Sequence, residues 1–148
     1  MSFAVLPEHV HAALAVAATR VTSIVATVDE DGRPRTAPFG SMYAPSPDRL
    51  RFGCDRGHAT FANLCRDPRV AVCLIVPPGT AVTVFGLATV VREAMDEFPS
   101  DAVVDIRIDE VKDDMLPGAV IDSGVRYSVP PEALAFIERY IAEIRRGA

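Results

Sequence analysis

The sequence predicts an α+β fold in which an antiparallel sheet closes on itself and helices flank it. Five or six strand-like runs follow one another, mostly through short turns. This order favours hairpin connections over alternating βαβ units. Helical patterns occur at the beginning, in the middle and at the end of the chain. No repeat, low-complexity tract or long linker divides the chain, so residues 1–148 are expected to form a single domain.

Composition narrows the possible classes of protein. The chain has 15 basic and 20 acidic side chains and a net charge of −5, which argues against general nucleic-acid binding. No apolar run approaches the roughly 18 residues that a membrane-spanning helix needs. Cys54, Cys65 and Cys73 match neither a disulfide framework nor a CxxC metal site. The apolar stretch 12–18 has no Lys or Arg before it, so export is not expected. We therefore expect a cytoplasmic protein with no membrane partner.

Apolar and β-branched runs separated by Gly, Pro and Asp predict the strands. The predicted strands are Val21–Val28, Arg33–Tyr43, Arg49–Cys54, Arg69–Val76, Thr80–Arg92 and Ala102–Lys112, with Val125–Val129 as a further short candidate. Helices are predicted from Pro7 to about Ala18, over Ala59–Arg66, and from Pro130 to near the C-terminus. In the last helix one apolar stripe faces the core. The stripe consists of Leu134, Ile137, Ile141 and Ile144.

The segment 51–68, RFGCDRGHATFANLCRDP, is the most informative for chemistry. A strand leads through a glycine turn into a helix, and the first turn of that helix offers unpaired backbone N–H groups. With Arg56, His58 and Thr60 beside them, these groups suit a phosphate. The alternative is that Asp55 or Thr60 simply caps the helix, which is the commoner arrangement. The sequence shows no serine or cysteine nucleophile motif, no HExxH, no P-loop and no GxGxxG.

Three runs of the sequence resemble the pyridoxamine 5′-phosphate oxidase-like family of flavin-binding split barrels. They are ATVDEDGRPRTAPFGSMY, LRFGCDRGHATFANLCRDPRVAV and TAVTVFGLATVV. The shared features are the acidic turn before Gly-x-Pro, the helix that ends in Asn-Leu and Asp-Pro-Arg-Val, and the later strand with its glycine. The resemblance implies a homodimer of six-stranded antiparallel split barrels with flanking helices. It also implies two FMN molecules in clefts between the subunits.

The resemblance also implies which residues hold the cofactor. The flavin ring would lie along the second strand, the phosphate would lie at the turn and helix start, and two further segments would flank the ring. The implied cofactor-binding residues are Phe39, Gly40, Ser41, Met42, Gly53, Cys54, Arg56, His58, Ala59, Thr60 and Ala81. Arg126 and Tyr127 could line the cleft from the partner subunit. No catalytic acid or base and no metal site are predicted.

The sequence departs from true pyridoxamine-phosphate oxidases at four positions. Those enzymes carry cations where this chain has Ala37, Met42, Ala59 and Thr60. Arg56, Arg51 or Arg35 could compensate, because charge-assisted hydrogen bonds are about twice as strong as neutral ones. We therefore expect an FMN-binding flavoprotein, an oxidoreductase on an unidentified small molecule, that is not a true pyridoxamine-phosphate oxidase.

Three alternatives stay open at this point. The first is a non-enzymatic carrier of flavin or haem, for which His58 and Cys54 are the candidate axial ligands. The second is a deazaflavin-dependent reductase. The third is a relative that keeps the fold and has lost the cofactor.

Overall fold

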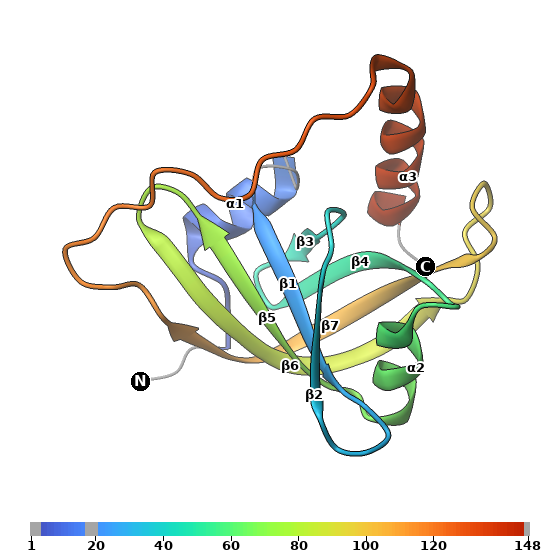
Figure 1. Ribbon diagram of the computed structural model, residues 1–148, viewed down its shortest axis with the longest axis horizontal. Helices are drawn as coiled ribbons and strands as arrows, with labels where there is room; N and C mark the ends of the chain where they lie inside the picture. The colour runs from blue at the N-terminus through green and yellow to red at the C-terminus, as the bar shows by residue number, and fades with distance from the viewer. Residues whose placement is uncertain (1–3, 17–20, 147–148) are drawn as a thin grey trace.

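The computed structural model describes residues 4–16 and 21–146 and is built around one curved antiparallel sheet (Figure 1). The strands within these residues are β1 (Thr22–Val28), β2 (Pro34–Pro38), β3 (Tyr43–Ser46), β4 (Arg49–Asp55), β5 (Arg69–Val76), β6 (Thr80–Arg92) and β7 (Asp101–Asp113). Their order in the sheet is β2-β1-β5-β6-β7-β4-β3. The two edge strands, β2 and β3, are consecutive in sequence. The connection 39–42 therefore joins one edge of the sheet to the other.

The helices pack at the ends and the rim of this sheet (Figure 1). They are α1 (Glu8–Val16), α2 (Ala59–Arg66), the 3₁₀ turn η2 (Pro131–Ala133) and α3 (Leu134–Arg146). Helix α1 contacts β3, α2 contacts β1 and β6, and α3 contacts β3 and β4. In the described part of the chain no helix has both the length and the apolar character needed to cross a membrane.

The core lies on the concave side of the sheet. Val25, Val72, Val84 and Ile106 come from β1, β5, β6 and β7, and none has exposed surface. In β1 buried and half-buried residues alternate strictly, as expected for a strand with one face in the core. The strand register therefore follows from the apolar pattern of the sequence.

Most predicted elements are confirmed. Helix α2 and strands β5 and β6 have the predicted bounds, β1 starts one residue later, and β4 and β7 are slightly longer than predicted. Helix α1 ends at Val16 among the described residues, and the predicted extension over residues 17–18 lies outside them. An α+β fold with an antiparallel sheet is thus established.

The predicted second strand, Arg33–Tyr43, is wrong as a continuous element. It is divided into β2 and β3, so the described residues contain seven strands where six were implied. In the interruption, the Phe39 N–H donates to the Ser23 carbonyl at 3.0 Å, and Ser41 Oγ accepts from the Gly53 N–H at 3.1 Å. These bonds turn the chain from one edge of the sheet to the other.

The predicted short strand Val125–Val129 is also wrong, because this segment is irregular. The Val125 N–H donates to Thr22 Oγ1 at 2.9 Å, and a strand ladder would need that group for a backbone partner. The segment between β7 and α3 crosses the open end of the sheet instead (Figure 1).

The apolar stripe of α3 is buried only at its C-terminal end. Ile144 has no exposed surface, Ile137 and Ile141 are half-buried, and Leu134 is 51% exposed. The buried carboxylate of Glu143 fixes that end, because it pairs with Arg92 at 2.7 Å and accepts from the Asp96 N–H at 2.7 Å. The N-terminal half of α3 therefore stands away from the core.

Candidate functional site

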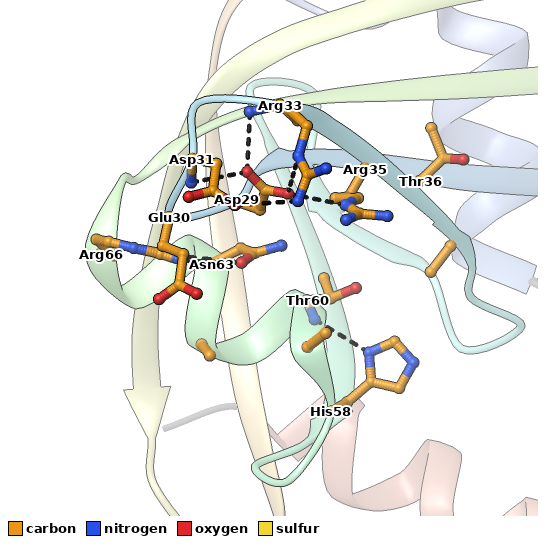
Figure 2. Close-up of a pocket in the computed structure, with 13 residues that line it drawn as sticks. Asp29, Glu30, Asp31, Arg33, Arg35, Thr36, His58, Thr60, Asn63 and Arg66 are labelled. Atoms are coloured by element: carbon orange, nitrogen blue, oxygen red, sulfur yellow. Dashed lines mark hydrogen bonds and ion pairs between the residues drawn. The ribbon is translucent and has the colours of Figure 1, made fainter.

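A cavity of about 590 Å³ opens between the β1–β2 turn, strand β2 and the first turns of α2 (Figure 2). This volume lies within the range of small-molecule sites, roughly 300–1,000 Å³. The lining residues are Asp29, Glu30, Asp31, Arg33, Arg35, Thr36, Ala37, His58, Ala59, Thr60, Ala62, Asn63 and Arg66. We call it the polar cavity. Its charged side chains are three carboxylates and three arginines.

Asp29 organises the turn at the rim of the polar cavity. Its carboxylate accepts hydrogen bonds from the backbone N–H groups of Asp31 and Arg33, each at 2.9 Å, and from Arg35 Nε at 2.9 Å. The backbone bond from Arg33, with Arg35 and Asp31 assisting, lowers the pKa of Asp29 from 3.8 to about 2. Gly32 closes the turn with a φ of +78°, which favours glycine. Asp29 therefore stays ionised and fixes the position of Arg35.

His58 caps helix α2 and leaves one ring nitrogen available. Its Nδ1 accepts from the Thr60 N–H at 3.1 Å, a bond drawn in Figure 2. A neutral imidazole that accepts at Nδ1 carries its proton on Nε2. Nε2–H can thus donate to a ligand, beside the Thr60 hydroxyl and the backbone at the start of α2. The sequence-based alternative that Asp55 or Thr60 caps the helix is therefore wrong, because His58 is the N-cap.

Arg66 reaches the polar cavity from the last turn of α2. Both terminal nitrogens donate to Asn63 Oδ1, at 3.0 and 3.3 Å, and Asn63 Nδ2 in turn donates to Thr27 Oγ1 in β1 at 3.1 Å. Within residues 4–16 and 21–146 Arg66 pairs with no carboxylate, whereas Arg33 and Arg35 both pair with Asp29. Arg66 is therefore the guanidinium of this cavity best placed to bind an added anion.

The predicted site residues fall into separate groups. His58, Ala59 and Thr60 line the polar cavity, as does Arg35. Phe39 stands next to it, with its ring 5.9 Å from that of His58 and 4.8 Å from that of Phe52.

A second cavity, of about 380 Å³, lies on the other side of Phe39. It is lined by Val21, Thr22, Ser23, Ile24, Pro38, Phe39, Gly40, Val125 and Tyr127. Gly40 and Ser41 also line a third, smaller cavity that includes Tyr127 and Tyr140. Tyr127 thus borders two cavities of its own chain, and Arg126 lines a further one between residues 122–129 and α3.

The other predicted residues do not line these cavities. Met42 has no exposed surface, and burial raises the pKa of the Cys54 thiol to about 12. Gly53 lies against the Tyr140 ring. Arg56 donates to the Glu93 carbonyl at 2.5 Å, and Ala81 pairs with Ile75 within the sheet.

Arg51, considered as a compensating cation, is also engaged elsewhere. It makes a two-pronged contact with Asp105, with distances of 2.6 and 3.0 Å.

Sequence reasoning missed Asp29, Arg33, Asn63 and Arg66 as cavity residues. One signal could have found two of them. Ala59, Asn63 and Arg66 are spaced four and three residues apart in a predicted helix, so they share one face. The contribution of Asp29 depends on the geometry of the turn, which the residue types alone do not specify.

Comparison with known proteins identifies the family of this chain. The family model described as pyridoxamine 5′-phosphate oxidase matches residues 7–121. The chain belongs to the pyridoxamine 5′-phosphate oxidase-like family. No curated protein matches the chain in sequence. The match extends past β7 and stops before η2 and α3. The polar cavity is therefore built entirely from the part of the chain that the family model matches.

Solved structures support the same assignment. A candidate pyridoxamine 5′-phosphate oxidase from Lactobacillus delbrueckii shares 32% identity, with a TM-score of 0.61, over 74% of this chain and 94% of that one. An F420 reductase shares 19% identity, with a TM-score of 0.58, over 72% and 98%. An FMN-binding protein from Syntrophomonas wolfei shares 11%, with a TM-score of 0.58, over 73% and 88%. The last two similarities establish the fold alone.

Proposed function

We propose that the protein is an FMN-binding oxidoreductase that acts on a small molecule. The observation that carries the proposal is the polar cavity, in which His58 Nε2–H and the Thr60 hydroxyl lie at the start of α2 and Arg66 lies at the C-terminal end of the same helix. These donors suit a phosphate monoester, because charged donors and helix N-termini favour dianions. The family membership and the FMN-binding relative support the choice of FMN.

The residues around Phe39 suit the rest of the cofactor. Phe39 lies between the polar cavity and the 380 Å³ cavity, whose walls are largely apolar. A cavity of ~150 Å³ holds a single benzene ring, so 380 Å³ has room for a fused tricyclic ring. Bound FMN would supply hydride or electron transfer. The chain's own residues would grip the phosphate, hold the ring against Phe39 and exclude water.

Pyridoxamine phosphate is not the proposed substrate. Ala37, Ala59 and Thr60, at three positions where the resemblance places cations in the true oxidases, all line the polar cavity and are neutral. We expect the FMN-loaded protein to remain oxidised when pyridoxamine 5′-phosphate is added without oxygen.

We also propose that the protein is a homodimer, as the resemblance implies. The convex face of the sheet carries apolar side chains in register across three strands, which pair as Ile24 with Cys73, Ala26 with Ala71, and Ala71 with Phe85. The solvated face of an antiparallel sheet is normally polar. A second copy packed on this face, which we call the outer face, would keep these side chains from water.

Titration of FMN fluorescence tests the proposal, together with an absorbance spectrum of the purified protein from 300 to 700 nm. The wild-type protein should bind FMN and quench its fluorescence. Replacement Arg66→Gln should weaken FMN binding by about tenfold or more, because a hydrogen bond to a charged group contributes about 1.5–3 kcal/mol. Arg69→Gln is the matched control, since Arg69 is exposed and pairs with Asp67 outside the cavity.

Riboflavin makes the test specific for the phosphate. It lacks that group, so Arg66→Gln should leave riboflavin binding unchanged. A wild-type protein that binds neither flavin would overturn the proposal, and equal losses of both flavins would remove Arg66 from the phosphate site.

A deazaflavin-dependent reductase is the second candidate function, because one of the structural relatives is an F420 reductase. Parallel titration with that cofactor decides between the two. A haem-binding function has less support from the two candidate axial ligands. Cys54 is buried, and His58 uses one ring nitrogen to cap α2.

A further inference from the structure

A small cavity lies between α3 and the segment that precedes it. Its volume is about 200 Å³, and its walls are Gly40, Ser41, Tyr127, Phe136, Ile137, Tyr140 and Ile141. We call it the aromatic cavity. Three of the seven residues are aromatic and none is charged. The resemblance implies that Gly40 and Ser41 contact the flavin, but it assigns no ligand to the space that they enclose with Tyr127 and α3.

The aromatic wall is held in place. The Tyr140 hydroxyl donates to Asp101 Oδ2 at 2.5 Å, and its ring packs at 5.2 Å from Phe98. Phe136 packs on the same Phe98 at 4.8 Å and lies nearly parallel to Tyr140, with 19° between the ring planes. Parallel and edge-on rings are the arrangements in which a further aromatic ring binds well. Tyr140 and Phe136 are therefore in position before any ligand enters.

The size of the aromatic cavity selects the ligand. A cavity of ~150 Å³ lined by apolar side chains takes up benzene. The aromatic cavity is only somewhat larger, so it fits one ring with a small substituent and not a fused tricyclic system. The neighbouring 380 Å³ cavity shares Gly40 and Tyr127 with it. A ring in the aromatic cavity would thus lie beside whatever occupies the larger one.

The Ser41 hydroxyl determines which substituent a ring bound in the aromatic cavity can carry. Ser41 Oγ accepts from the Gly53 N–H at 3.1 Å, which fixes the oxygen. Among the described residues the Ser41 hydroxyl donates to no acceptor, so its proton is available to a ligand. A neutral carbonyl is the matching acceptor. A carboxylate would lose its hydration without gaining a cation.

We infer that the aromatic cavity binds a neutral single-ring aromatic molecule with one carbonyl oxygen, and that Ser41 donates to this oxygen. That such a molecule is the substrate of the flavin rests on the function proposed above. Binding of the ring itself rests only on the cavity. A second copy of the chain is assigned to the outer face of β1, β5 and β6 and not to this cavity.

Fluorine NMR with three probes tests the inference on the purified full chain. The probes are 4-fluoroacetophenone, 4-fluorotoluene without an acceptor, and 4-fluorobenzoate with a charge. The ketone should bind most tightly and the benzoate about tenfold more weakly or worse, because its charge is desolvated without a partner. Each titration is run with and without FMN.

Variants locate the binding site. Ile137→Trp fills the cavity and should weaken ketone binding about tenfold or more, through steric exclusion. Leu116→Trp adds the same bulk at a residue that is 71% exposed and outside the cavity, and should change binding less than about twofold. Ser41→Ala should weaken the ketone about threefold to tenfold and leave 4-fluorotoluene unchanged.

Each contrary result has a defined meaning. Absence of ketone binding at millimolar concentration, or binding that Ile137→Trp leaves intact, would overturn the inference. So would conversion of a wild-type dimer to a monomer by Ile137→Trp, measured by light scattering, because a second copy would then occupy the cavity. Ketone binding with the expected variant pattern but no FMN binding would support the cavity and remove the proposed function.

Discussion

Burial distinguishes the reactivity of Cys54 from that of Cys65. Cys54 is 1% exposed, and desolvation, with Asp101 and Asp55 nearby, raises its thiol pKa to about 12. The thiolate is the reactive form, so at pH 8 Cys54 is inert. Cys65, in contrast, is exposed on α2.

Alkylation tests this difference. Iodoacetamide at pH 8 should modify Cys65 within minutes and leave Cys54 unmodified in the native protein, as measured by peptide mass spectrometry. Unfolding in guanidinium should abolish the protection. Rapid native alkylation of Cys54 would show that β4 opens readily at this position.

The carboxylate of Asp29 should couple stability to acid pH. Its folded pKa lies near 2 and its ordinary value is 3.8, because Arg33, Arg35 and Asp31 donate hydrogen bonds to its charged form. A depressed pKa stabilises the fold at pH values above about 4, and this stabilisation is lost as pH falls through 2.

Denaturation over pH 2–6 measures this contribution. The free energy of unfolding of Asp29→Asn should lie below that of wild type at pH 6, and the two should converge between pH 4 and pH 2. Glu30→Gln, in the same turn but outside the Asp29 hydrogen bonds, is the control and should follow wild type. A gap that stays constant down to pH 2 would contradict the assignment.

At the scale of elements, α3 docks on β4 through a close approach between Tyr140 and Gly53. A methyl group on Gly53 would lie 2.7 Å from carbons of the Tyr140 ring, inside van der Waals contact. Helix α3 is also tied at its C-terminal end by Glu143. Gly53 was predicted to face a cofactor, whereas in this chain Tyr140 occupies the adjoining space.

Replacement of this glycine tests the docking. Gly53→Ala should destabilise the protein by about 1–3 kcal/mol through overpacking, and the second change Tyr140→Ala should relieve part of the clash. Gly79→Ala, where no atom lies within 4 Å, is the control. Thermal or urea unfolding of wild type, Gly53→Ala, Tyr140→Ala, the double variant and Gly79→Ala measures the effect, and additive losses in the double variant would show that the two residues do not interact.

At the scale of the whole molecule, the sheet is apolar on its core face and, over β1, β5 and β6, also carries apolar side chains on its outer face. Phe85, 36% exposed, stands on the outer face with Ala71 and Cys73, and the core lies on the opposite face. A contiguous exposed apolar patch usually marks an interface. The homodimer proposed above would use this patch and would place polar cavities near the subunit boundary.

The molar mass of the variant Phe85→Lys in solution, measured by light scattering, tests this interface. Phe85→Lys adds a charge that a buried interface would have to desolvate, so it should convert a wild-type dimer to a monomer. Leu116→Lys, at a more exposed residue away from the sheet, should leave the dimer intact. A monomeric wild type, or a dimer unaffected by Phe85→Lys, would contradict this interface.

Part of the candidate site could be predicted from local sequence. His58, Ala59 and Thr60 follow a strand and open a helix, and both elements have clear periodic patterns, so their place in the polar cavity was expected. Phe39, Gly40 and Ser41 border cavities as well. The contribution of Arg66 was not expected, because it depends on the bonds of Asn63 across to Thr27 in another element.

The sequence by itself determined the α+β class, the antiparallel order and most strand bounds, because apolar alternation and turn residues act over short distances. Tertiary structure alone decided the rest. The division of the predicted second strand comes from hydrogen bonds with residues far away in sequence, such as Ser41 with Gly53. The partial burial of α3 and the filling of the space beside Gly53 by Tyr140 likewise depend on contacts between distant elements. Local pattern cannot specify such contacts, because it does not encode which elements meet.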